Sequence, residues 1–156
     1  PVSKITGFAL YSSVPSMKNM KVAGVLTDGK YASVNTTDDW LVRGGIGNRE
    51  VVYDLKTPQT IHSVKMGFEF KPSVRALYPK TVKIMTSLDG EHFQEATFVQ
   101  MSNPADDYTK SFRPELKFSA TDARFVKVIF ENAGKYNDVD GISASSILIL
   151  DEIEIN

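Results

Sequence analysis

The chain closes with the stretch Ile147-Leu-Ile-Leu-Asp-Glu-Ile-Glu-Ile155, and this stretch decides the class of fold. Four apolar residues come first, an acid pair follows, and the last residues alternate Glu and Ile. The pattern predicts a strand that is buried on both faces at its start and on one face at its end. A carboxylate inside such a strand is costly unless it is paired or bound to a cation. Asp151-Glu152 is therefore a candidate functional feature.

Upstream of this strand, short runs rich in β-branched and aromatic residues recur between turn signals. Val64, Met66 and Phe68 share one face of such a run, and His62 is in phase with them. No ten-residue stretch keeps a helical period. The sequence therefore predicts an all-β chain folded as a two-sheet sandwich. The predicted strands cover residues 8–11, 49–55, 60–68, 81–87, 93–99, 112–118, 124–131 and 147–155.

The connections between these runs alternate between short and long. If successive strands are antiparallel, the short turns lie at one pole of the sandwich and the long loops at the other. Long loops on a rigid scaffold commonly carry binding surfaces, although they can also merely tolerate insertion. The short turns are Lys56–Gln59, Leu88–Glu91 and Ser119–Asp122. The long loops are Val34–Asn48, Glu69–Lys80, Gln100–Ser111 and Asn132–Ser146.

Size and composition narrow the classes of function. With 156 residues, 42% of them apolar, the chain is expected to form one domain, residues 1–156, with residues 1–19 as a lead-in segment. The net charge of −1 argues against a nucleic-acid binder. No apolar run reaches membrane-spanning length, and no signal peptide precedes Pro1, where the chain opens as an excised module would. The absence of cysteine excludes disulfides and thiol catalysis.

A second acidic signal, Leu26-Thr-Asp28-Gly29, lies where the first long excursion begins. Calcium takes six to eight oxygen ligands from carboxylates and backbone carbonyls. A turn over Val25–Ser33 can supply carbonyls and the Asp28 carboxylate, and Glu152 from the terminal strand can complete the shell. The alternative is an ordinary Asp-Gly turn beside a solvent-facing Glu152.

Several motifs, each weak alone, occur together in one order. They are Val25-Leu-Thr-Asp-Gly29, Trp40, Val51-Val-Tyr-Asp-Leu55, Tyr78-Pro79, Ser87-Leu-Asp-Gly90, Ala123-Arg-Phe-Val-Lys-Val128 and Asp151-Glu-Ile153. In this order the chain, from about Lys21 onward, resembles the discoidin or factor V/VIII C-type (galactose-binding-like) family, which includes carbohydrate-binding module family 32. The ending and the stretch Trp40-Leu-Val-Arg-Gly-Gly45 are most similar to versions attached to bacterial polysaccharide-degrading enzymes.

The resemblance implies an eight-stranded antiparallel jelly-roll β-sandwich with a structural calcium ion. It also implies that the metal pins the first long loop to the last strand and takes no part in chemistry. The Asp151 carbonyl is a further candidate ligand. Carried over by motif, the ligands are the Val25 carbonyl, Asp28, the Lys30 carbonyl, Ser33 and Glu152.

The family's sugar site lies on loops at the long-loop pole. Such a site needs an aromatic face to stack on a sugar and planar donors for its hydroxyls. Each candidate has a bland alternative: Trp40 as a structural plug, the arginines as solvated or ion-paired, and Tyr78 as a packing residue. Neither His62 nor His92 is placed like the histidine of the galactose binders. The candidates are Trp40, Arg43, Arg75, Tyr78, Tyr136 and Asn137.

The resemblance implies a non-catalytic module that ties a bacterial enzyme or surface protein to a glycan, outside the cell or at its surface. The alternative is an adhesion or protein-docking domain of the same family. The predicted loop tips are mostly polar and acidic, which disfavours membrane lipid as the partner. Two histidines without a serine motif beside them argue against a stand-alone enzyme.

Overall fold

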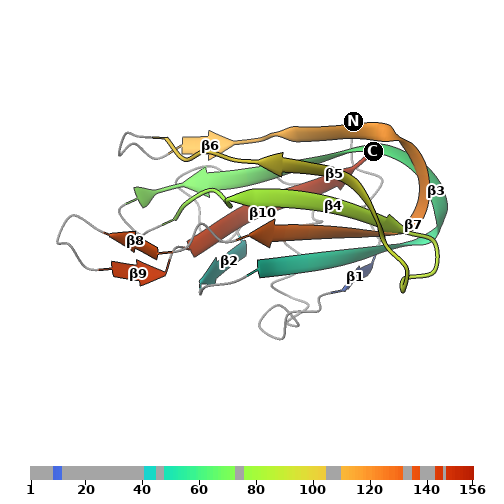
Figure 1. Cartoon of the computed structure of the whole chain (residues 1–156), viewed down its shortest axis with the longest axis horizontal. Coiled ribbons are helices and arrows are strands. Elements are labelled where there is room, and N and C mark those ends of the chain that lie inside the picture. Colours follow the sequence, from blue (N-terminus) through green and yellow to red (C-terminus); the bar gives the residue numbers. More distant parts are fainter. Residues whose placement is uncertain are drawn as a thin grey trace.

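A computed structural model of the chain describes residues 9–11, 41–44, 48–72, 76–104, 110–131, 135–137, 143–145 and 147–156. These residues form ten strand segments and no α-helix (Figure 1). Within this part of the chain, no helix is long and apolar enough to cross a membrane. The segments are β1 (Ala9–Tyr11), β2 (Leu41–Gly44), β3 (Asn48–Phe70), β4 (Thr81–Ser87), β5 (Gln94–Gln100), β6 (Lys110–Phe112), β7 (Glu115–Glu131), β8 (Lys135–Asn137), β9 (Ser143–Ser145) and β10 (Ile147–Ile155).

Two long strands, β3 and β7, build both layers of the sandwich. They pair antiparallel along their lengths and bend together at one end of the molecule (Figure 1). On one side of the bend β7 pairs with β4, which pairs with the edge strand β5. On the other side β3 pairs with β10, which pairs with β2. All these described pairings are antiparallel, so the all-β sandwich predicted from the sequence is confirmed.

One apolar core fills the space between the layers. Phe68 from one layer meets Phe130 from the other, with ring centroids 5.9 Å apart in an edge-to-face arrangement. The predicted inward faces are confirmed by complete burial of the alternating residues Val64, Met66 and Phe68 on β3, and Val126, Val128 and Phe130 on β7. Such alternation is what a strand with one face on a core requires.

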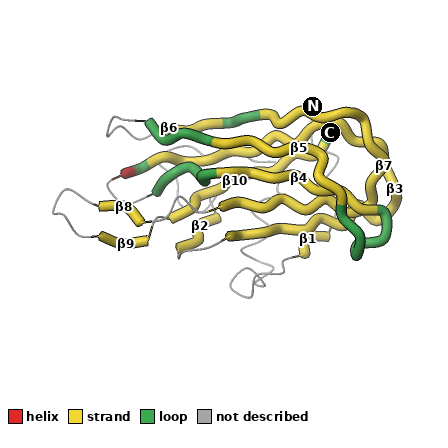
Figure 2. The backbone as a smooth tube through the Cα atoms, in the orientation of Figure 1, coloured by secondary structure: helices red, strands yellow, loops and turns green. Residues whose placement is uncertain are grey.

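The strand ends sort into two poles, as the loop lengths predict. At one pole, the turn pole, lie the bend of β3 and β7 and the turn from β4 to β5 (Figure 2). At the other, the loop pole, Lys80 donates its N–H to the Glu131 carbonyl, and Met101 donates its N–H to the Lys80 carbonyl. Phe70 pairs with Lys110 at the same end. The described ends of the long connections therefore meet at one pole.

Two predicted tight turns are wrong. Residues 56–59 and 119–122 do not separate strands, since β3 and β7 continue through them. The ladder shifts register between Asp54 and Gln59 and then resumes with Gln59 opposite Ala123. Lys56 absorbs the bend with a φ of 72°, a left-handed conformation. Bulges of this kind bend a strand pair without ending it, which is why a turn signal and a continuous strand coincide here.

Three further expectations are corrected. His62 is exposed and not in phase with Val64, because the ladder shifts again between Ile61 and Ser63. Strand β2 lies inside the predicted long loop Val34–Asn48. Strands β8 and β9 form a separate two-stranded ladder within the predicted loop Asn132–Ser146. All three of these short strands lack the apolar alternation that marks the long ones.

Candidate functional site

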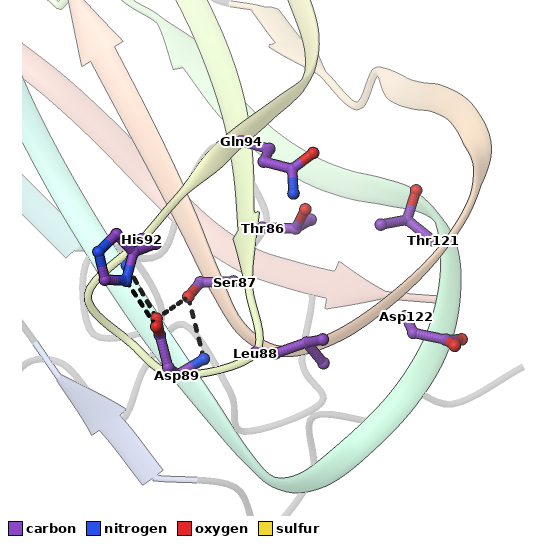
Figure 3. A pocket seen from close by; sticks show the side chains of 8 residues that line it. All are labelled: Thr86, Ser87, Leu88, Asp89, His92, Gln94, Thr121 and Asp122. Carbon is purple, nitrogen blue, oxygen red and sulfur yellow. Dashed lines mark hydrogen bonds and ion pairs between the residues drawn. The ribbon is translucent and has the colours of Figure 1, made fainter.

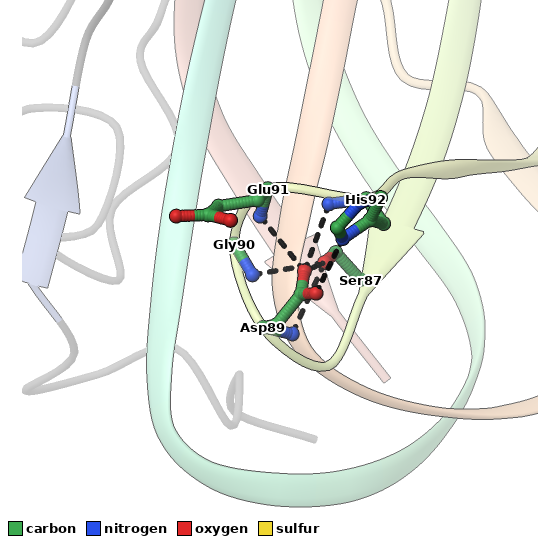
Figure 4. Close-up of polar contacts among 5 residues, drawn as sticks. All are labelled: Ser87, Asp89, Gly90, Glu91 and His92. Carbon is green, nitrogen blue, oxygen red and sulfur yellow. Dashed lines mark hydrogen bonds and ion pairs between the residues drawn. The ribbon is translucent and has the colours of Figure 1, made fainter.

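The turn from β4 to β5 is organised around the carboxylate of Asp89 (Figure 4). Its Oδ1 accepts hydrogen bonds from the N–H groups of Glu91 and His92, both at 2.8 Å, and from the Ser87 hydroxyl at 2.9 Å. Its Oδ2 lies 2.6 Å from Nδ1 of His92. These groups, the His92 N–H first, hold the pKa of Asp89 far below its usual range. The carboxylate is fully occupied with closing the turn.

A shallow pocket of about 210 Å³ lies beside this turn (Figure 3). Ser87, Asp89 and His92 line one side, and Thr121 and Asp122 line the other. The three residues do not form a nucleophilic triad, because the Ser87 hydroxyl donates to the same carboxylate that the imidazole contacts. A triad needs the base beside the nucleophile. The turn pole therefore offers no activated hydroxyl in this cluster.

The bend of the long strands is clamped by an ion pair between Asp54 and Arg124. The guanidinium donates through Nε at 2.9 Å and Nη2 at 3.0 Å to the two carboxylate oxygens. This two-pronged contact lowers the pKa of Asp54 to about 2. Beside it the Thr60 hydroxyl donates to Asp122 at 2.6 Å, joining β3 to β7 across the bend.

At the loop pole, Asn103 ties two long connections together. Its side-chain oxygen accepts the Tyr78 N–H at 2.7 Å, and its amide donates to the Tyr78 carbonyl at 3.4 Å. Tyr78 is only 5% exposed, and its ring packs against Phe68, Phe70 and Phe112. Burial raises the pKa of its phenol. A sugar-stacking role for Tyr78 stays a prediction, and its burial favours the packing alternative.

Glu69 is the residue at this pole that sequence reasoning missed. It is 5% exposed, next to the end of β3, and its carboxylate has no hydrogen bond or ion pair among the described residues. Burial raises the pKa of this carboxyl, and the charge of Lys71 offsets only part of that rise. The available signal was the acid within the apolar run Gly67-Phe68-Glu69-Phe70, a pattern like the Asp151-Glu152 pair.

The other predicted sugar-site residues lie at the loop pole or outside the described residues. Arg43 is in β2, where it pairs with Leu148, and the ladder of Tyr136 and Asn137 with β9 is at the same end of the molecule (Figure 1). Trp40 and Arg75 lie outside the described residues. Their contacts with a sugar stay predictions.

Of the predicted calcium ligands, only Glu152 lies among the described residues. Glu152 lies in β10 between Leu150 and Ile153, where the ladder with β3 shifts register. A bulge at this point interrupts the pairing of the acid pair with β3, and bulges commonly redirect side chains at functional positions. Among the described residues there is no cluster of three metal-binding side chains. Val25, Asp28, Lys30 and Ser33 lie outside them.

Solved structures of several proteins share this fold at low sequence identity. The chain matches chitosan-binding module 1 of a chitosanase/glucanase from Paenibacillus sp. IK-5 with a TM-score of 0.64 and 16% identity, covering 99% of this chain and 98% of that one. It matches CpGH89CBM32-5 from Clostridium perfringens, solved with GalNAc-β-1,3-galactose, with a TM-score of 0.56 and 16% identity, covering 95% and 92%. It also matches SpGH29 with a TM-score of 0.60 and 12% identity, covering 98% of this chain.

The chain spans 27% of the length of SpGH29. A search of the curated proteins found no match. The strand pairing and these structural matches define an all-β sandwich domain. The family model for the F5/8 type C domain matches residues 11–145, and the chain belongs to this family.

Proposed function

We propose that the chain is a non-catalytic carbohydrate-binding module that binds a glycan at its loop pole. The observation that carries this proposal is the gathering of the described long-connection ends at one pole of an F5/8 type C domain. Two of the structures named above support it: a chitosan-binding module and a domain solved with a disaccharide. The ligands of these two proteins, chitosan and a disaccharide, suggest a glycan rather than a protein as the partner of this chain.

The proposed ligand contacts are a stacking platform from Trp40 and hydrogen-bond donors from Arg43 and Arg75, and Tyr136 and Asn137 are the further proposed contacts. Tyr78 stabilises the loop pole beneath the site, because its ring packs against the core. A monosaccharide has about 12 heavy atoms, and at about 0.3 kcal/mol per atom its binding is worth about 4 kcal/mol, which is near-millimolar affinity. Useful retention on a polymer then depends on neighbouring modules.

The proposed metal is a structural Ca²⁺ ion. Carboxylate and carbonyl oxygens are the donors that calcium takes, and the bulge in β10 frees the acid pair from regular pairing with β3. Val25, Asp28, Lys30, Ser33 and Glu152 would hold the ion, which would fix the first long loop to the last strand. Removal of calcium with a chelator is expected to lower the melting temperature, and Glu152→Gln is expected to abolish that response.

The proposed setting is a secreted or surface-attached bacterial protein, with the chain as an accessory domain of a glycan-degrading enzyme. Binding of the chain to a glycan array, followed by calorimetric titration of the best sugars, tests the central proposal. Trp40→Ala and Arg75→Ala are expected to reduce affinity at least tenfold. Leu88→Ala, at the turn pole, is the matched control and should bind as wild type. Binding to a protein partner with no glycan bound would favour the docking alternative and contradict the proposal.

A further inference from the structure

Among the described strands, no pairing joins the two layers along one side of the sandwich, between two strand edges. Strand β5 is the last strand of its layer, with β4 as its only described partner. In the other layer, β6 and the first half of β7 pair only with β3 among the described strands. A groove of about 360 Å³ runs between these two edges. Its volume falls in the range of small-molecule sites, roughly 300–1,000 Å³.

The floor of this groove is apolar. Thr97 and Val99 of β5 pair with Ile84 and Val82, which are fully buried, so they share the inward face of their layer. Across the groove, Phe112 and Leu116 pair with the buried residues Phe68 and Val64. The groove is thus the unclosed edge of the core.

One aromatic ring in the groove is both exposed and held in place. Phe112 is 45% exposed, and its ring packs on Tyr78 with centroids 5.5 Å apart. Tyr78 is in turn fixed by Phe68, Phe70 and the amide of Asn103. A rigid ring with an accessible surface can stack on the C–H face of a sugar at little entropic cost.

Polar side chains line the same groove from both edges. Gln100 and Ser102 come from the β5 side, and Glu115 and Lys117 come from β7. None of these four side chains has a hydrogen bond or ion pair with another described residue. Together they provide neutral, cationic and anionic groups that can donate hydrogen bonds to, or accept them from, a ligand rich in hydroxyl groups.

We infer that this groove is a second glycan subsite, which takes an internal segment of an oligosaccharide against Phe112. The inference rests on the proposed function, because it assumes a glycan as the ligand. The described residues that line the groove follow the edges of β5 and β7, so an extended chain can lie along these edges. A peptide strand is a poorer occupant, because Pro114 lacks an N–H and interrupts the β6–β7 edge to which the strand would pair.

The experiment compares the binding of a hexasaccharide (the hexamer) with that of the matching monosaccharide (the monomer). It is done once with N-acetylglucosamine units and once with glucosamine units. Phe112→Ala is expected to weaken hexamer binding about three- to tenfold and to leave monomer binding unchanged, since a stacked ring is worth about 0.5–1.5 kcal/mol. Phe98→Ala is the matched control: Phe98 is also 45% exposed but is not part of the groove, and its substitution should change neither affinity. Titrations are paired with circular dichroism to verify folding.

Phe112 packs on Tyr78, so Phe112→Ala can change hexamer binding by disturbing Tyr78. Lys117→Gln and Gln100→Ala test the groove without touching that contact. Both should weaken the hexamer selectively, and amide NMR shifts of Thr97 and Lys117 should respond to the hexamer alone. Equal binding of the hexamer by wild type and all groove variants would overturn the subsite but leave the proposed function intact. Absence of any glycan binding by wild type would overturn both. Shifts of these amides with an extended peptide, and none with the hexamer, would assign the groove to a peptide instead.

Discussion

The two poles of the sandwich differ in whether their described carboxylates have hydrogen-bond or ion-pair partners. At the turn pole, Asp89 accepts three hydrogen bonds on one oxygen and contacts His92 through the other, and Asp54 is held by both prongs of Arg124. At the loop pole, Glu69 is nearly buried with no described hydrogen-bond or ion-pair partner, and the Phe112 ring is nearly half exposed. Among the described residues, the carboxylates at the turn pole have partners and Glu69 at the loop pole has none.

This difference separates what holds the fold from what is available for binding. Groups that satisfy one another stabilise the native state and have little capacity left for a ligand. Buried carboxylates without partners and exposed rings are costs that natural proteins tend to keep at functional sites. The described residues therefore point to the loop pole and the groove that leads away from it.

The largest effect on stability is expected from Gly90→Ala, at the turn pole. Gly90 has a φ of 80°, and a Cβ there would lie 3.1 Å from the Phe125 ring. The left-handed backbone costs about 1–2 kcal/mol for a non-glycine residue, and displacing the ring adds to that, so a loss of about 2–3 kcal/mol is expected. Urea denaturation at pH 7 measures it. A loss below 0.5 kcal/mol, well under the estimate for the backbone alone, would mean that the turn is not rigid.

The next largest effect is expected from Asp54→Asn, which removes the clamp at the bend. The pKa of Asp54 is about 2 in the folded state against 3.8 in the free residue. The full shift is worth about 2.4 kcal/mol, but Arg124 is 40% exposed, so solvent screening reduces the expected loss to about 1 kcal/mol.

Because the folded pKa of Asp54 is lowered, its stabilising contribution is present above pH 3.8 and is lost as the pH falls through about 2. The free energies of unfolding of wild type and Asp54→Asn should therefore converge as the pH falls from about 4 to about 2. Arg124→Gln is the matched variant and should show the same convergence. A difference that is constant with pH would show that the loss comes from packing and not from the ion pair.

The framework of the fold was predictable because it follows from the spacing of large apolar residues. Strand β4 was predicted with its observed ends, and β10 with its observed length. The bend of β3 was not predictable in the same way. Its residues Lys56-Thr-Pro-Gln59 have the composition of a turn, and only the pairing with β7 shows that the ladder continues through them.

The candidate site was less predictable than the fold. Nothing in the order of residues shows that Phe112 lies against Tyr78, because their contact depends on how two long connections return to the sheet. Glu69 could have been noticed as an acid in an apolar run, but its lack of a partner among the described residues is a property of the packing. Short strands such as β8 carry too few residues for any periodicity to appear.

At the loop pole, Glu69→Gln is expected to stabilise the protein by about 0.5–1 kcal/mol at pH 7. Burial raises the pKa of this carboxyl, so its ionised form costs stability, and a neutral amide of the same shape removes that cost. The sign is opposite to that for Asp54. Below pH 4.5, the ordinary pKa of a glutamate carboxyl, Glu69 is protonated in both the folded and the unfolded state, and the two proteins should have equal stability.

Thermal melts of wild type and Glu69→Gln between pH 4 and pH 8 check this sign. A destabilised Glu69→Gln at pH 7 would mean that the carboxylate has a partner that stabilises its charge. Addition of calcium to both proteins separates the two explanations. If the carboxylate binds a cation, calcium should stabilise wild type more than the variant.

The smallest effect is expected from Leu88→Ser at the turn pole. Leu88 is 58% exposed at the tip of the turn from β4 to β5, next to Ser87 and Asp89, which close the turn without it. Removing a side chain that already faces water changes little apolar burial, so stability should stay within about 0.5 kcal/mol of wild type. Glycan affinity should also be unchanged, because the turn pole is opposite the proposed site. A loss of glycan binding in Leu88→Ser, with the melting temperature preserved, would place a binding surface at the turn pole and reverse the assignment of the two ends.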